Sequence, residues 1–311
     1  MPGLITNYIF GERAFQALSP NYLKEIIRNN TNSFRMGLQG SDIFNYYLTP
    51  SGQKYQHHIT KILKKRNTHL FVDNMLDYIS VLDPSDKDMC LAYIAGFLCH
   101  YSLDIHTYPY LHYRMCKDIE ADPSLARDTF YYRRLETMMD TILLKKINHM
   151  EPSQLNLEAL VSMNKKERRN ICNCLLYSLR TTYNYRLSRK SLLKIIASVK
   201  KTCIFLQTNP QMHIHMVRFF KKRMHLSSAR SSLIYPEYTG DPFDYLNENK
   251  TDWYISHDKD PHTESFIELL EHADLFTNQV LEAFDDYLAW HGSREELLMI
   301  INSPSFYNTE S

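Results

Sequence analysis

Glycine is scarce in this chain, which has 8 glycines among 311 residues, whereas a share of about 7% is usual. No glycine lies between Gly96 and Gly240, and the only close pair is Gly37 and Gly40. A G-x-G-x-x-G turn or a Walker A loop therefore cannot be written on this sequence. This absence excludes nucleotide enzymes of the Rossmann and P-loop kinds.

The shortage of turn-forming residues also argues against a many-stranded β fold, which needs a turn every 8–12 residues or so. Residues 153–209, for example, contain neither proline nor glycine. We therefore expect an all-α protein. The clearest helix begins with an S-x-x-D capping box at Ser85 and Asp88 and is expected to stop at Pro109. Other helices are expected over residues 20–30, 59–80, 124–149, 166–205 with a break, 211–225, 263–290 and 293–302.

Export signals and membrane spans are missing as well. The first residues lack a basic stretch followed by an apolar one, and no run of about 18 apolar residues occurs. The six cysteines include no C-x-x-C pair, so we expect reduced thiols rather than disulfides or a zinc knuckle. These features predict a cytoplasmic location and no transmembrane segment.

The net charge of +1 conceals a strong segregation of charge along the chain. Residues 165–230 carry 16 basic residues and one acid, whereas residues 231–311 carry 3 basic and 17 acidic residues. One interpretation is that the two segments pack together and neutralise each other. The other is that the basic segment faces an anionic partner, either nucleic acid or a phospholipid surface. The acidic segment argues against nucleic acid.

His100 and Asp104 are the first candidate site residues. They are four residues apart, so they project from one face of the predicted helix. An imidazole and a carboxylate on one face can share a metal ion, and Gly96 lies one turn earlier, where its missing side chain leaves room for a metal or another ligand. The alternative is a core histidine that is simply hydrogen-bonded to the aspartate.

Asp42 follows the glycines of MGLQGSDIFNYY, where a carboxylate can be a ligand or, more commonly, an N-cap or Asx-turn residue. His57 and His58 are adjacent before an amphipathic stretch, so at most one of them can face a common site on a helix. An exposed pair of histidines is the alternative at that position.

Glu136 has Tyr132 one turn before it and Asp140 one turn after it. The two carboxylates at i and i+4 could bind a metal ion. The alternative is surface pairing of Glu136 with the nearby Arg133 and Arg134.

Five stretches, in order, resemble the bacterial zinc-dependent phospholipase C family of the phospholipase C/P1 nuclease superfamily. MPGLITNYIFGE is similar to the family's M-P-x-x-x-T-H-x-x-F-G, and MGLQGSDIFNYY to L-G-x-Q-G-P-D-I-F-x-Y-Y. GFLCHYSLDIHTYPY is similar to G-F-x-x-H-Y-x-L-D-x-x-x-H-P-Y, and YRRLETMMD to H-x-x-L-E-x-x-I-D. DYLNENKTDWY followed by ESFIELLEHA is similar to the C-terminal D-x-L-N…W…S-F-x-E-L pattern.

The resemblance implies an all-α, multi-helix phospholipase C/P1 nuclease-like fold with additional C-terminal helices. It also implies a metal cluster that hydrolyses phosphodiesters. The positions that match metal ligands are Asp42, His58 in preference to His57, His100, Asp104 and, for a second metal, Glu136. Asp42 would also orient a catalytic water.

Three histidines of the family pattern are replaced, by Asn7, Tyr108 and Tyr132. The resemblance therefore implies one zinc ion in a four-ligand site and a degraded second site, since neither asparagine nor neutral tyrosine is a usual zinc ligand. His106 and His112 flank Tyr108 as substitutes, although helical phase is against His106.

We expect a phosphodiester hydrolase with a reduced metal site, acting on a phospholipid or a smaller ester. The alternatives are a non-catalytic binding protein on the same scaffold and a nuclease-like phosphodiesterase. We expect one compact unit with a metal-site core at 1–150, a basic helical segment at 151–230, and an acidic connection with C-terminal helices at 231–311. The oligomeric state stays open.

Overall fold

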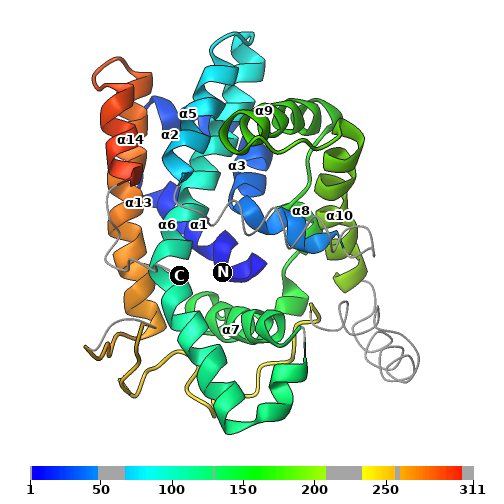
Figure 1. Ribbon diagram of the computed structural model, residues 1–311, viewed down its shortest axis with the longest axis vertical. Coiled ribbons are helices and arrows are strands. Elements are labelled where there is room, and N and C mark those ends of the chain that lie inside the picture. The colour runs from blue at the N-terminus through cyan, green and yellow to red at the C-terminus, as the bar shows by residue number, and fades with distance from the viewer. Residues whose placement is uncertain (1, 48–66, 129, 208–232, 256–259, 303–311) are drawn as a thin grey trace.

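The computed structural model describes residues 2–47, 67–128, 130–207, 233–255 and 260–302, and this part of the chain is all-α as expected. Its one β feature is an isolated bridge between Trp253 and His262. The helices (Figure 1) are α1 (Leu4–Ala17), α2 (Tyr22–Asn29), α3 (Thr31–Gly37), η1 (Gly40–Tyr46), α5 (Thr68–Ile79), α6 (Pro84–Ala121), η2 (Pro123–Arg127), α7 (Tyr131–Asn148), η3 (Pro152–Gln154), α8 (Leu157–Leu160), α9 (Lys165–Tyr183), α10 (Arg189–Gln207), α13 (Phe266–Leu288) and α14 (Arg294–Asn302).

Most helices expected from the sequence are confirmed, including the break within 166–205. Asn184 ends α9 in the left-handed conformation, with φ 52°, and α10 begins at Arg189. The N-terminal helices α1 and α3 were not predicted. The helix expected at 211–225 and the start of the one expected at 59–80 lie outside the described residues.

The long central helix α6 departs from the sequence expectation at both ends. It begins at Pro84, with Asp83 at the N-cap, so the Ser85 capping box does not form its start. It also runs through Pro109 to Ala121. Proline at this position removes one backbone hydrogen bond, but Pro109 is buried, and packing against the neighbouring helices keeps the backbone helical. As a result, Tyr108 stays on the same helix as Asp104.

α3 and α6 cross with their backbones in direct contact, and this crossing depends on two glycines. A Cβ atom at Gly96 would collide with the carbonyl oxygen of Phe34 and lie 2.9 Å from the Leu38 nitrogen. A Cβ atom at Gly37 would collide with the carbonyl oxygen of Tyr93. The space beside Gly96 is therefore occupied by the α3 backbone, and the expectation that it leaves room for a metal is wrong.

Asp140 of α7 fixes the start of α1. Its carboxylate accepts hydrogen bonds from the backbone nitrogens of Ile5 (3.0 Å) and Thr6 (2.9 Å) and from the Thr6 hydroxyl (2.6 Å). These are free N–H groups of the first helical turn, which an acidic group satisfies well. A Cβ atom at Gly3 would lie 2.6 Å from the Asp140 carboxyl carbon, so glycine is required for this approach.

The basic and acidic helices lie on opposite sides of α6, with α9 and α10 on the right and α13 and α14 on the left of Figure 1. Their ion pairs, among the residues the structure describes, are made with other parts of the chain. These pairs include Lys166–Asp86, Lys200–Glu158, Arg13–Asp274 and Arg294–Asp73. Among the described residues, the basic and acidic helices thus do not pair with each other, although Leu233 of the acidic segment lies beside α10. Neutralisation of the whole basic segment, part of which lies outside the described residues, stays a prediction.

The cysteines and the hydropathy of the helices agree with the sequence analysis. All six cysteines are free thiols, and five of them are buried. In the described part of the chain, none of the helices has the length and apolarity needed to cross a membrane.

The glycine crossing generates the first prediction. Gly96→Ala should lower the free energy of unfolding by about 3 kcal/mol or more, because the added methyl group meets backbone that cannot move aside as a side chain can. Gly292→Ala is the control, since its Cβ atom would meet Asp286 Cβ at 3.1 Å near the surface, and it should change stability by less than about 1 kcal/mol. Equal unfolding midpoints in urea for both variants would contradict the crossing.

Candidate metal and phosphodiester site

Asp42 is brought to the site by η1, directly after the crossing of α3. Gly40 has φ +43°, in the left-handed region, and redirects the chain so that η1 turns back towards α6. The Asp42 side chain is buried, and its Oδ1 atom accepts a hydrogen bond from Asn45 Nδ2 at 3.0 Å. Asp42 does not cap η1, which follows Gln39 and has no side-chain cap bond.

His100 of α6 packs against η1 at Gly40. A Cβ atom at Gly40 would lie 2.6 Å from His100 Nε2, so the absence of a side chain there lets the imidazole approach the turn. His100 is 4% exposed, and its buried Nδ1 atom has no hydrogen-bond partner among the described residues. The alternative in which His100 is a core histidine bonded to Asp104 is therefore not realised in this structure.

Asp104 and Tyr108 follow His100 at one-turn intervals on α6, and Tyr132 of α7 faces them. Burial raises the pKa of the Tyr132 phenol well above its usual value, and the negative charges of Glu136 and Asp104 raise it further. Tyr108 and Asp42 contribute to the same shift. The side chains of η1, α6 and α7 thus converge on one region, and Tyr132 is a neutral phenol there.

The Glu136 carboxyl group of this region has a raised pKa. Burial is the main cause and raises its pKa to about 8, and the charges of Asp42 and Asp140 act in the same direction, against that of Arg133. The alternative of surface pairing with Arg134 is wrong, because Arg134 forms its ion pair with Asp128. A carboxyl group held against its own ionisation is typical of functional sites.

The spacing of Glu136 and Asp140 allows the two carboxylates to share a metal ion. In the structure, however, the Asp140 carboxylate is occupied by its hydrogen bonds to α1. Its pKa is nevertheless raised to about 6 by burial, against those hydrogen bonds. Tyr235 also contacts Asp140, with its hydroxyl 3.2 Å from Oδ2. This role of Asp140 and Tyr235 was missed by the sequence analysis, since a cap supplied from another helix leaves no local sequence signal.

Asn7 stands where the family pattern has histidine, and it is 1% exposed. Neither its amide oxygen nor its amide nitrogen has a hydrogen-bond partner within the described ranges. Unsatisfied buried amide groups are rare and call for a ligand, water or strain as an explanation. Asn7 is thus a buried polar side chain of α1 whose amide has no partner among the described residues.

The four other histidines considered as ligands in the sequence analysis lie in different surroundings. His57 and His58 lie outside the described residues. His106 donates from Nδ1 to the carbonyl of Ser102 at 2.7 Å, and its ring packs against Phe276 of α13, so it faces away from the site as helical phase predicted. The His112 ring lies 5.9 Å from that of Tyr108.

The donor chemistry fits zinc, since the region holds carboxylates and a buried imidazole whose Nδ1 atom has no partner among the described residues. The candidate side chains that the structure describes do not form a complete ligand shell. Within residues 2–47, 67–128, 130–207, 233–255 and 260–302, no three His, Cys, Asp or Glu side chains come close enough together to hold a metal ion. The set is thus incomplete in this part of the chain, and His58 would have to join it from outside.

The raised pKa of Glu136 predicts how metal-free protein responds to pH. Between about pH 5 and pH 8 the folded chain keeps a proton on Glu136 that the unfolded chain releases, so the stability contributed by this group falls as pH rises. Glu136→Gln should remove this loss. The variant should gain about 2–5 °C in unfolding midpoint over wild type at pH 8, and less at pH 5.

Glu268→Gln is a control of opposite sign. Its hydrogen bond from Lys250 is the main cause that lowers the pKa of Glu268 to about 2. The stabilisation is present above the usual glutamate pKa and is lost as pH falls towards 2. This variant should therefore be less stable than wild type by the same amount at pH 5 and pH 8. A Glu136→Gln difference that is also constant over that range would contradict the raised pKa.

Comparison with known protein families bears on this region directly. The family model described as zinc dependent phospholipase C matches residues 8–190, which is more than half of the chain and spans Asp42, His100, Asp104 and Glu136. No curated protein and no solved structure matches the chain. The match and the all-α fold confirm the resemblance seen in the sequence, and the chain belongs to the zinc-dependent phospholipase C family.

Proposed function

We propose that this chain is a phosphodiester hydrolase with a reduced metal site, and that a phospholipid is its substrate. The observation that carries the proposal is the buried His100 imidazole beside η1, whose Nδ1 atom has no hydrogen-bond partner among the described residues, in a family that depends on zinc. A buried imidazole without a hydrogen bond is unfavourable unless something else binds it.

The proposed ligands are Asp42, His58, His100 and Asp104. Asp42 and Asp104 would supply carboxylate oxygens and the two histidines neutral imidazoles, a set that suits zinc. Zinc in such a site makes bound water acidic and polarises a phosphoryl oxygen. Asp42 would also orient the attacking water, and its Oδ1 atom accepts a hydrogen bond from the Asn45 amide on the same turn.

A second metal position would retain Glu136 alone, which supports a single ion. Tyr132 is held as a neutral phenol by burial, and Asn7 offers only an amide oxygen, which is a poor ligand for zinc. The free thiols favour a reducing compartment, so a cytoplasmic location stays a prediction.

We expect purified, zinc-loaded protein to hold about one zinc ion per chain, as four ligands of one site imply. His100→Ala should lose this ion. His106→Ala is the matched control, because His106 is a buried histidine of the same helix that is bonded to Ser102, and it should keep the ion. Elemental analysis after gel filtration measures both. Wild-type protein that stays metal-free after loading would rule the site out.

We further expect the zinc-loaded protein to hydrolyse a chromogenic phosphodiester. Asp42→Asn should reduce the rate by about a hundredfold or more, the usual effect of losing a group that positions or deprotonates water. Asp86→Asn should not, because Asp86 pairs with Lys166 in the first turn of α6, about four helical turns before His100. The rate of nitrophenolate release, per bound zinc, is the measurement.

Two other results would support the two alternative functions. Zinc binding without hydrolysis of any phosphodiester would identify a non-catalytic protein on this scaffold. Hydrolysis of single-stranded nucleic acid at a higher rate than phospholipid would identify a nuclease-like enzyme instead.

A further inference from the structure

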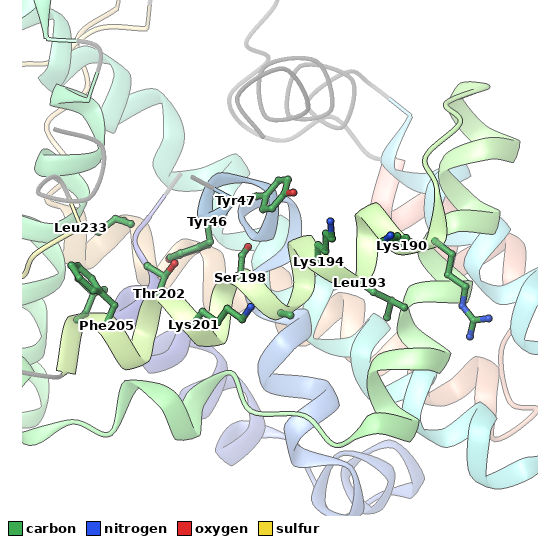
Figure 2. Close-up of a pocket in the computed structure, with 13 residues that line it drawn as sticks. Tyr46, Tyr47, Lys190, Leu193, Lys194, Ser198, Lys201, Thr202, Phe205 and Leu233 are labelled. Carbon is green, nitrogen blue, oxygen red and sulfur yellow. The ribbon is translucent and has the colours of Figure 1, made fainter. Parts of the chain in front are cut away.

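An open groove of about 1000 Å³ runs along α10, bounded by η1 on one side and by Leu233 on another. Figure 2 shows the side chains that line it, which come from all three of these elements. Its walls include the apolar side chains of Leu193, Phe205, Leu206 and Leu233. None of its described lining residues is acidic.

Lys190, Lys194 and Lys201 line the same groove and are exposed. None of these three lysines forms an ion pair or a side-chain hydrogen bond with another residue that the structure describes. Elsewhere on α9 and α10, Lys166 pairs with Asp86 and Lys200 with Glu158, whereas Lys165 and Arg180 are exposed and form no ion pair with a described residue. The groove differs from those positions because its cations lie beside an apolar wall.

With the exposed Arg189, which also lines the groove, the channel combines an apolar wall with four cations, and it is complementary to an amphiphile that has an anionic head group. Nucleic acid would instead need bases stacked on exposed aromatic rings, whereas the aromatic lining residues Tyr46, Tyr47 and Phe205 are buried or half-buried. The acidic helices α13 and α14 lie on the other side of α6 (Figure 1). An anionic surface would repel that side and attract α10, so the charge segregation orients the molecule although its net charge is only +1.

Tyr46 connects this groove to the candidate site. It lies on η1, four residues after Asp42, and lines the groove at its buried wall. Burial raises the pKa of the Tyr46 phenol well above its usual value, and the nearby Cys203, Asp42 and Asp140 add to the effect. Tyr46 at the groove and Asp42 at the candidate site are thus carried by the same short helix.

We propose that the α10 groove is a docking surface for anionic phospholipid in a membrane, with the lysines at the head-group phosphates and the apolar wall along an acyl chain. Polybasic segments gain affinity for anionic bilayers with each cation near the surface, and apolar contact adds to it. Docking requires no hydrolysis, so this inference goes beyond the proposed function and is tested separately from it.

The experiment is cosedimentation of the full chain with vesicles of phosphatidylcholine alone or with about 30% phosphatidylglycerol. The test variant is Lys190→Gln/Lys194→Gln/Lys201→Gln. The control is Lys165→Gln/Arg180→Gln/Arg186→Gln, which removes the same charge from exposed positions of the basic segment outside the groove. We expect wild type to bind the anionic vesicles only. The groove variant should bind at least tenfold more weakly, and the control within about twofold of wild type.

Several outcomes would overturn the docking surface. Equal losses in the two triple variants would mean that affinity comes from diffuse charge. Equal binding to neutral vesicles would remove the role of the cations, and release by inorganic phosphate would identify a phosphate site rather than a membrane surface. Binding of a single-stranded oligonucleotide in preference to anionic vesicles would assign the groove to nucleic acid. Unfolding midpoints within about 2 °C of wild type establish that the variants are folded.

Discussion

The contact between the backbones of α3 and α6 at Gly37 and Gly96 is the constraint on which the candidate site depends. Side chains normally hold helix axes 8–10 Å apart, and only glycine at both positions allows the observed approach. Because α3 ends at this crossing, η1 follows immediately over the same face of α6. Asp42 is thereby delivered to the region of His100, and Gly40 leaves room for the imidazole.

The same region carries features that are unfavourable for stability alone. Removal from water raises the pKa values of Glu136 and Asp140, and Asn7 and His100 have buried polar atoms without partners in the described part of the chain. Groups of this kind lower stability unless a ligand compensates them. Asp140 is the exception, since its hydrogen bonds to Ile5 and Thr6 tie α1 to α7. Asp140 therefore supports the fold, whereas the buried polar atoms of Asn7 and His100 lack partners among the described residues.

Much of the fold and the candidate residues could be predicted from the sequence. The predictions that failed show which features depend on tertiary packing. The one-turn spacing of His100 and Asp104 placed them on one face because helical periodicity is local. Pro109 did not end α6, since burial and packing against other helices outweighed its local preference. Gly96 was interpreted as space for a ligand, whereas it is filled by α3, a helix that the sequence analysis did not find. Short helices such as α3 have weak periodicity and are specified mainly by tertiary packing.

The charge distribution shows the same limit of prediction from sequence. The sequence shows how much charge each segment carries, but not which segments meet. The structure separates α9 and α10 from α13 and α14 by the width of α6, and thereby leaves the lysines of the α10 groove without acidic neighbours among the described residues. Whether opposite charges neutralise each other or form separate surfaces is decided by topology.

The most direct test of this account is a crystal structure of the zinc-loaded protein with anomalous scattering data collected on both sides of the zinc absorption edge. The account predicts a single strong zinc peak bounded by Asp42, His100 and Asp104, at about 2 Å from each ligand atom, with His58 completing the set. A peak elsewhere, or none between η1 and α6 in fully loaded crystals, would contradict the claim that the glycine crossing builds a zinc site.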